Sequence, residues 1–242
     1  MKQISKYTGF AFLICLTVLL GGCRLFGIRG NGNVINVDRP VAAFDRIEVS
    51  GYYKVLLVRG TKEALSVEAD ENLMEHIRTR VENGTLVIDA DRTMRHSKSL
   101  KIFITFVNLK GIELNGAVNI YNESELTLDD LDINLSGAAE GKMALNVRKL
   151  DLEMSGGSKF ELTGKADDVN INASGAVHLY SIEMEIQRMR LELSGAGLAE
   201  VNVKEKLDTD ISGASKIWYK GNPQLTQHVS GAASIEKIEG TE

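Results

Sequence analysis

The sequence predicts an all-β protein whose main part is a parallel β-helix with coils of about 19 residues. Three observations support this fold class. The tripeptide Ser-Gly-Ala, or a close variant of it, recurs seven times at a steady interval. The residues before each copy alternate between polar and apolar, as in a strand with one buried face. Proline occurs only at Pro40 and Pro223, which suits a chain in which nearly every segment donates to a β ladder.

The glycine of each tripeptide defines the repeat. Successive glycines are 21, 19, 19, 20, 18 and 18 residues apart, and they are Gly116, Gly137, Gly156, Gly175, Gly195, Gly213 and Gly231. A second alternating segment follows each copy, so we expect at least two short strands per coil. The residues beside each glycine are small because stacked coils lie about 4.8 Å apart and the corner leaves little room. We assign residues 109–242 to these repeats.

Residues 37–108 do not repeat and are expected to form a β-rich part that packs continuously with the solenoid. A short helix is predicted over 70–77, with Asp70 as its N-cap. The Asn83-Gly84 pair lies between two alternating runs and predicts a hairpin, because these residues tolerate the positive φ angles of a type I′ turn.

Residues 1–22 have the features of a lipoprotein signal peptide. Two lysines precede an apolar stretch, residues 9–20, that is too short to span a membrane comfortably. The following Leu-Gly-Gly-Cys sequence looks like a bacterial lipobox, which would place cleavage before Cys23 and a lipid on its sulfur. An uncleaved signal anchor and a plain secretory peptide are the alternatives. Residues 23–36 are rich in glycine and asparagine and are predicted to form a flexible tether.

Several classes of partner and cofactor are disfavoured. Loss of the leader with Cys15 would leave Cys23 as the only cysteine, so neither a disulfide framework nor a cysteine-based metal site is expected. The four histidines lack metal-ligand spacing, and no cofactor is predicted. The net charge of -5 argues against nucleic acid. Attachment to a membrane, with the outer membrane favoured and its side left open, would come from acyl chains on Cys23.

Two kinds of candidate site lie on the predicted outer faces. Carboxylate pairs stand two residues apart on one strand in Asp151 with Glu153 and in Asp208 with Asp210, as a glycoside-cleaving site would require. Such pairs also arise on any solvated strand, and this second interpretation is favoured. Three aromatic residues each follow their glycine by five positions and could stack on sugars or a protein partner, and they are Tyr121, Tyr180 and Trp218. The alternative is that these rings simply cover the flank of the coil.

The interior positions of the last coils are less apolar than those of earlier coils. Thr209 and Gln227 occupy positions that are aliphatic in the corresponding earlier coils, and Thr226 precedes Gln227. We therefore expect an open sheet edge at the C-terminal end, which a capping loop or self-association would cover.

The chain resembles the bacterial DUF2807 family of auto-transporter adhesin head GIN domains over roughly residues 30–240. The motifs that carry this resemblance are the Gly-Asn-Gly-Asn-Val run at 30–34, the segments 44–51, 67–73 and 81–86, and the recurring Leu-Ser-Gly-Ala. The resemblance implies a β-helical envelope protein with an adhesive role.

Three hypotheses for the function follow. The leading one is a lipid-anchored, non-enzymatic binding protein of the cell envelope that binds a glycan or an envelope protein. A pectinase-like polysaccharide-degrading enzyme and a purely structural, self-assembling module are the alternatives.

Overall fold

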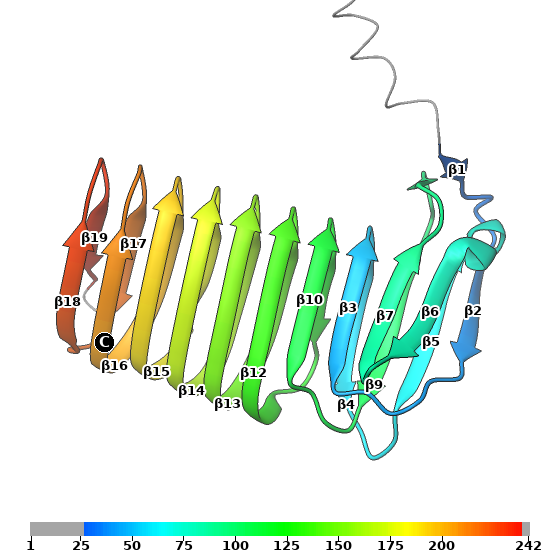
Figure 1. The fold of residues 1–242 in the computed structure, drawn as a ribbon, viewed down its shortest axis with the longest axis horizontal. Helices are drawn as coiled ribbons and strands as arrows, with labels where there is room; N and C mark the ends of the chain where they lie inside the picture. Colours follow the sequence, from blue (N-terminus) through cyan, green and yellow to red (C-terminus); the bar gives the residue numbers. More distant parts are fainter. Residues whose placement is uncertain (1–26, 239–242) are drawn as a thin grey trace, which may run out of the picture.

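The alternation within each repeat places one set of side chains inside a solenoid and the other set on its surface. The computed structural model describes residues 27–238 and stacks the coils as parallel strands (Figure 1). Each coil holds about 19 residues, so the predicted parallel β-helix is confirmed. The predicted leader and the proposed lipidation site Cys23 lie outside the described residues.

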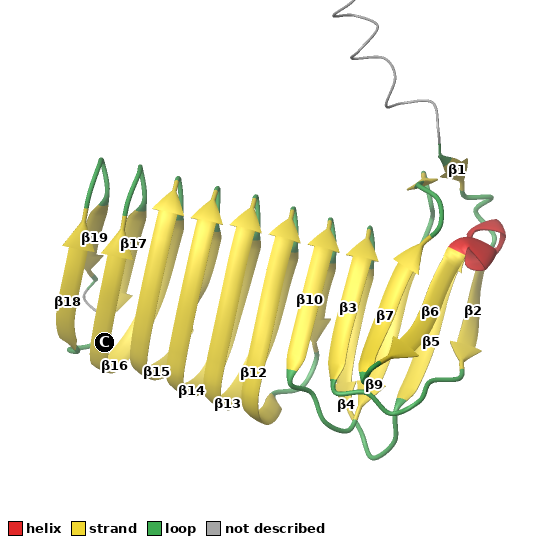
Figure 2. Ribbon diagram, in the orientation of Figure 1, coloured by secondary structure: helices red, strands yellow, loops and turns green. Residues whose placement is uncertain are grey.

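The described chain is built from strands and a short 3-10 helix, η2 (Glu71–His76) (Figure 2). The strands before the repeats are β1 (Ile28–Arg29), β2 (Val34–Arg39), β3 (Arg46–Gly51), β4 (Lys54–Arg59), β5 (Ala64–Asp70), β6 (Ile77–Glu82), β7 (Thr85–Ala90), β8 (Met94–Arg95) and β9 (Leu100–Phe106). The strands of the repeats are β10 (Gly111–Gly116), β11 (Asn119–Asn122), β12 (Leu126–Gly137), β13 (Glu140–Gly156), β14 (Lys159–Gly175), β15 (His178–Gly195), β16 (Leu198–Ile211), β17 (Lys216–Lys220), β18 (Gln224–Val229) and β19 (Ser234–Lys237).

The strands form two walls that enclose the core. The front wall has the order β6-β7-β3-β10-β12-β13-β14-β15-β16-β18. The back wall has the order β2-β5-β9-β4-β11-β13-β14-β15-β16-β17-β19. The long strands β13 to β16 belong to both walls, because each one bends once and continues along the other side of the coil.

From β3 onward, each front-wall strand is followed by a corner where the backbone is left-handed, and glycine occupies that corner. At Gly156 φ is +79°, and a Cβ atom would lie 2.4 Å from the carbonyl oxygen of Gly137 in the preceding coil. The next residue, Gly157, donates its backbone N–H to the same oxygen over 2.8 Å. This glycine column begins at Gly51, which pairs in register with Gly116. The coil geometry therefore starts well before residue 109, where the sequence repeat becomes visible.

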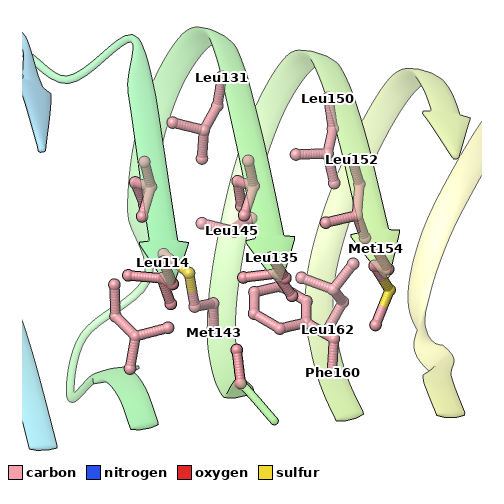
Figure 3. Packing of buried hydrophobic residues seen from close by; sticks show 14 of the residues in the cluster. Leu114, Leu131, Leu135, Met143, Leu145, Leu150, Leu152, Met154, Phe160 and Leu162 are labelled. Carbon is pink, nitrogen blue, oxygen red and sulfur yellow. The ribbon is translucent and has the colours of Figure 1, made fainter. Parts of the chain in front are cut away.

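The apolar columns form one hydrophobic core between the walls (Figure 3). Neighbouring coils complement each other in volume. Phe160 is fully buried, and its register partner Gly141 leaves the space that the ring fills. A Cβ atom on Gly141 would lie 1.5 Å from that ring. Asn202 is an exception to the apolar interior, because its buried Oδ1 accepts no hydrogen bond from the described residues.

Antiparallel strands and η2 close the N-terminal end of the solenoid (Figure 2). Leu73 of η2 is completely buried. The Arg39 guanidinium on β2 donates to the carbonyl oxygens of Met74 and Ile77 over 2.9 and 2.6 Å, which joins β2 to η2 and β6. These hydrogen bonds connect β2, the edge strand of the back wall, to η2 and to β6, the edge strand of the front wall.

The local predictions for this part are partly confirmed. Asn83 and Gly84 have φ angles of 51° and 80° and join β6 to β7, as expected for the predicted hairpin. The predicted helix is present, but Asp70 makes no side-chain capping bond to it. Its buried carboxylate instead accepts backbone N–H groups from Gly32, Lys98 and Ser99 over 2.8, 2.9 and 3.2 Å.

Residues 27–36 differ from the flexible tether that their composition predicts. β1 pairs in parallel with β8, and the first part of β2 pairs with β5. The Asn31 backbone N–H donates to Asn72 Oδ1 over 2.9 Å, and the Asn33 amide donates to Glu71 Oε2 over 2.8 Å. The segment is ordered because acceptors near the start of η2 satisfy the donors of this glycine- and asparagine-rich loop.

Candidate functional site

The outer face of the front wall carries three polar columns, which lie one, three and five residues before each corner glycine. At the centre of the middle column, Asn134, Glu153 and Asn172 pair in register on β12, β13 and β14. We call these three residues the amide–carboxylate column. None of the three makes a side-chain hydrogen bond or ion pair with another described residue. Neighbouring strands of a sheet are about 4.8 Å apart, so the column presents closely spaced polar groups with unused hydrogen-bonding capacity.

Two shallow grooves share the amide–carboxylate column. The first has a volume of about 480 Å³ and also includes the hydroxyl-bearing residues Ser136, Ser155 and Ser174. The second has a volume of about 440 Å³ and includes Asp151 and Arg190. The column therefore lies on a lightly grooved surface that could accommodate an extended polar ligand.

The predicted carboxylate pairs are present on this wall, but their charges are already stabilised. Burial alone would raise the pKa of Asp151, but hydrogen bonds from Lys149 and Asn170, over 2.5 and 2.7 Å, outweigh it and lower that pKa. A hydrogen bond of 2.6 Å from Lys206 lowers the pKa of Asp208. Each pair thus contains a carboxylate that is held in its ionised form.

Other carboxyl groups of the described residues also have lowered pKa values. Every described carboxyl group whose pKa departs clearly from its ordinary value has a lowered pKa, and these groups are Asp45, Glu68, Asp70, Asp89, Asp151, Asp168, Asp208 and Glu236. Glycoside cleavage by two carboxyl groups needs a general acid whose pKa is raised, so that it still carries a proton near neutral pH. The shifted carboxyl groups suit ion pairing and hydrogen-bond acceptance instead.

The three aromatic residues predicted as ligand contacts lie in one outward column of the back wall, but they are not contiguous. Glu200 lies in register between Tyr180 and Trp218. Two coils, with Lys142 and Glu161 in this column, separate Tyr121 from Tyr180. All three rings are half-buried. The structure therefore aligns them without joining them into one aromatic surface.

Interactions within the chain already engage two of these rings. Lys216 Nζ lies 4.8 Å from the centroid of the Trp218 ring, and the indole N–H donates to Glu236 over 3.2 Å. Lys159 Nζ lies 5.2 Å from the centroid of the Tyr180 ring. These contacts support the interpretation that the rings cover the coil flank, although a part of each ring remains accessible.

The sequence identified Glu153 but missed the two asparagines beside it as candidate binding residues. Aligning the repeats on their glycines places all three in one column, so the signal was present. The alignment does not show which side chains have hydrogen-bond partners. Asp151 accepts hydrogen bonds from Lys149 and Asn170, whereas Glu153 has no such partner among the described residues.

Within residues 27–238, no group of three or more acidic, histidine or cysteine side chains is placed to hold a metal ion. No helix in that part of the chain has both the length and the apolar character needed to cross a bilayer.

The comparisons with known proteins agree with this architecture. The model of the DUF2807 family, described as "Putative auto-transporter adhesin, head GIN domain", matches residues 43–223. A solved structure of a putative adhesin from Bacteroides fragilis NCTC 9343 is 26% identical with a TM-score of 0.82, and the match covers 88% of this chain and 100% of that one.

Two further solved structures show the same fold. A putative lipid binding protein from Parabacteroides distasonis ATCC 8503 is 24% identical with a TM-score of 0.69, over 88% of this chain and 99% of that one. A putative adhesin from Parabacteroides merdae ATCC 43184 is 21% identical with a TM-score of 0.73, over 88% and 100%. No curated protein matches the chain. Because the family model spans most of the solenoid and the solved relatives share its fold, the chain belongs to the DUF2807 family.

Proposed function

We propose that this chain is a non-enzymatic binding protein of the bacterial cell envelope that adheres to its ligand through the front wall of the solenoid. The observation that carries the proposal is the amide–carboxylate column, where Asn134, Glu153 and Asn172 stand in register without partners inside two shallow grooves. The family description and the 26% identical adhesin from Bacteroides fragilis support an adhesive role.

The chemistry of the column favours a polyhydroxylated ligand such as a glycan. Amide groups both donate and accept hydrogen bonds, and a carboxylate accepts them, so the column matches the mixed character of sugar hydroxyl groups. Successive contacts about 4.8 Å apart allow an extended chain to bind several coils at once. The rigid strands keep the contacts in position, which reduces the entropy lost on binding.

A polysaccharide-degrading enzyme is the less favoured function. The lowered pKa values of the Asp151 and Asp208 carboxyl groups favour their ionised forms, whereas glycoside cleavage needs a general acid that is still protonated near neutral pH. Binding without bond cleavage needs no such group.

The proposed attachment to the envelope rests on the sequence around Cys23, with acyl chains on its sulfur as the membrane contact. Mass spectrometry of the chain produced with its leader should find an acylated Cys23 and no residue before it. A Cys23→Ser variant should lose the acyl mass and leave the membrane fraction. Recovery of an unmodified, uncleaved wild-type chain would contradict the anchor and leave the binding proposal open to its own test.

The binding proposal is tested on a glycan array with a chain that starts at Gly27 and keeps every described contact. We expect selective binding that weakens at least about tenfold, or 1.4 kcal/mol, in Glu153→Gln and in Asn172→Ala. The first change replaces a charged acceptor with a weaker, neutral amide, and the second removes an amide that bonds to the ligand. Trp218→Ala is the control on the back wall and should bind normally. Loss of binding in Trp218→Ala alone would place the site at the aromatic column of the back wall. Binding that no variant weakens would contradict a site at either place.

A further inference from the structure

The C-terminal end of the solenoid exposes positions that earlier coils bury. Val229 follows Leu193 and Ile211 in one interior column, and its exposed fraction is 43% where theirs are 2% and 0%. Leu225 and Ile235 are only half-buried at the same end. Among the described strands, β18 pairs only with β16 and β19 only with β17. Within residues 27–238, both walls therefore end in a strand with one unpaired backbone edge (Figure 1).

These two edges carry few of the features that usually keep sheet edges apart. Natural edge strands carry charged side chains, proline or bulges that prevent pairing with another chain. β18 reads Gln-Leu-Thr-Gln-His-Val and contains no acidic residue, lysine, arginine or proline. β19 carries one charge of each sign, on Glu236 and Lys237. The Glu236 carboxylate is bound by Lys216 Nζ over 3.0 Å and by the Trp218 indole over 3.2 Å, and Lys237 Nζ donates to Asn222 Oδ1 over 3.2 Å. Little net charge is left to repel a second edge.

The opposite end also finishes in two edge strands, β6 and β2, but η2 closes the core there. There η2 inserts Leu73 into the core, and Arg39 fastens β2 to η2 and β6. Head-to-tail association would need two complementary ends and would continue into a filament, whereas contact between two identical ends closes after two copies.

We propose that two copies of this chain associate through their C-terminal ends about a two-fold axis. β18 of one copy then pairs in the antiparallel sense with β18 of the second copy, and the two β19 strands pair likewise. A second copy fits because it offers two strand edges at the same separation, one for each wall. Association buries Leu225, Val229 and Ile235 and completes the backbone hydrogen bonds of both edges. The inference does not depend on the ligand or on the proposed binding wall.

Sedimentation equilibrium of the full chain in density-matched detergent measures the mass of the assembly. We expect a concentration-dependent equilibrium between one and two copies that does not proceed to larger species. Gln227 is exposed on β18 and pairs in register with the buried Thr209 of the preceding coil. In the proposed pair, Gln227→Lys and Gln227→Glu each place like charges across the axis. Each variant alone should raise the dissociation constant at least about tenfold.

An equimolar mixture of Gln227→Lys and Gln227→Glu should restore association, which a misfolded variant could not do. Lys62→Glu, in the loop between β4 and β5, is the matched charge control and should associate like the wild type. A full chain that is monomeric at every concentration would overturn the proposal. Dimers that appear only after removal of residues 239–242 would overturn it too, because that result would mean that the chain's own C-terminal residues, and not a second copy, occupy this end of the solenoid. Failure of the mixture to recover would overturn the two-fold geometry.

Discussion

Two adjacent glycines, Gly156 and Gly157, make the corner geometry testable within a single turn. Gly156 has a φ of +79°, and a Cβ atom there would lie 2.4 Å from the Gly137 carbonyl oxygen. Gly157 lacks a left-handed backbone, and a Cβ atom there would be 4.0 Å from the same oxygen. Equivalent positions in other repeats carry alanine, as at Ala138 and Ala176. The substitutions Gly156→Ala and Gly157→Ala should therefore have opposite effects on the free energy of unfolding.

The magnitude for Gly156→Ala has two parts. A left-handed backbone costs an alanine about 1–2 kcal/mol. Relieving the overlap with Gly137 would shift one coil against the next, and overpacking of this kind costs about 1–3 kcal/mol. We expect Gly156→Ala to lower the free energy of unfolding by about 2–5 kcal/mol. Gly157→Ala should raise it by about 0.4–1 kcal/mol, because alanine restricts the unfolded chain and fits the folded one.

Urea unfolding followed by far-ultraviolet circular dichroism gives the midpoint and slope for both variants and the wild type. The two variants differ by one position and carry the same added methyl group, so each controls for the other. Equal shifts of the two midpoints, or an unchanged midpoint for Gly156→Ala, would refute the argument that the left-handed corner and the carbonyl above it require glycine.

Three further changes test other parts of the structure. In Asp70→Asn the charge that accepts three backbone N–H groups is lost, and urea unfolding should show about 1.5–3 kcal/mol less stability. Burial raises the pKa of Asp70, but these N–H groups outweigh it and lower that pKa. The wild-type advantage should therefore be full at neutral pH and decline as the pH falls through about 4 and below; a pH-independent difference would contradict this role. Gly141→Ala should destabilise the core by driving a methyl group into the Phe160 ring, and adding Phe160→Leu should recover part of the loss in a double-mutant cycle. Additive effects would mean that the two positions do not share space. Asn202→Ala should raise the thermal midpoint, because it removes a buried oxygen without a described partner; a lowered midpoint would show that the oxygen is satisfied.

The repeat made most of the fold predictable. Each corner glycine recurs with its neighbours in sequence, so the column, the alternation and the parallel register could all be read from local patterns. Asn83-Gly84 was equally accessible, because a hairpin depends on adjacent residues. The start of the solenoid is not predictable in this way, because Gly51 is followed by Tyr52 rather than by alanine and lies far in sequence from Gly116, the next corner glycine.

Contacts that do not repeat could not be predicted. The Asp70 carboxylate binds Gly32, 38 residues earlier in the chain, and no periodic signal links the two. The composition of the glycine- and asparagine-rich segment therefore predicts a tether, whereas these long-range contacts order residues 27–36. The same holds for the candidate site. The sequence predicts that Asp151 and Glu153 share one solvent-exposed face, but it does not show that only Asp151 is bound by Lys149 and Asn170.

Binding without cleavage is the property that we propose for the solenoid wall. The most direct measurement is mass spectrometry of a glycan library after incubation with the chain from Gly27 onward, with bound and unbound glycans separated. We expect a selected subset of glycans in the bound fraction, unchanged in mass, and loss of that subset with Glu153→Gln. Shortened glycans in either fraction, or a bound fraction with no selection over the library, would contradict it.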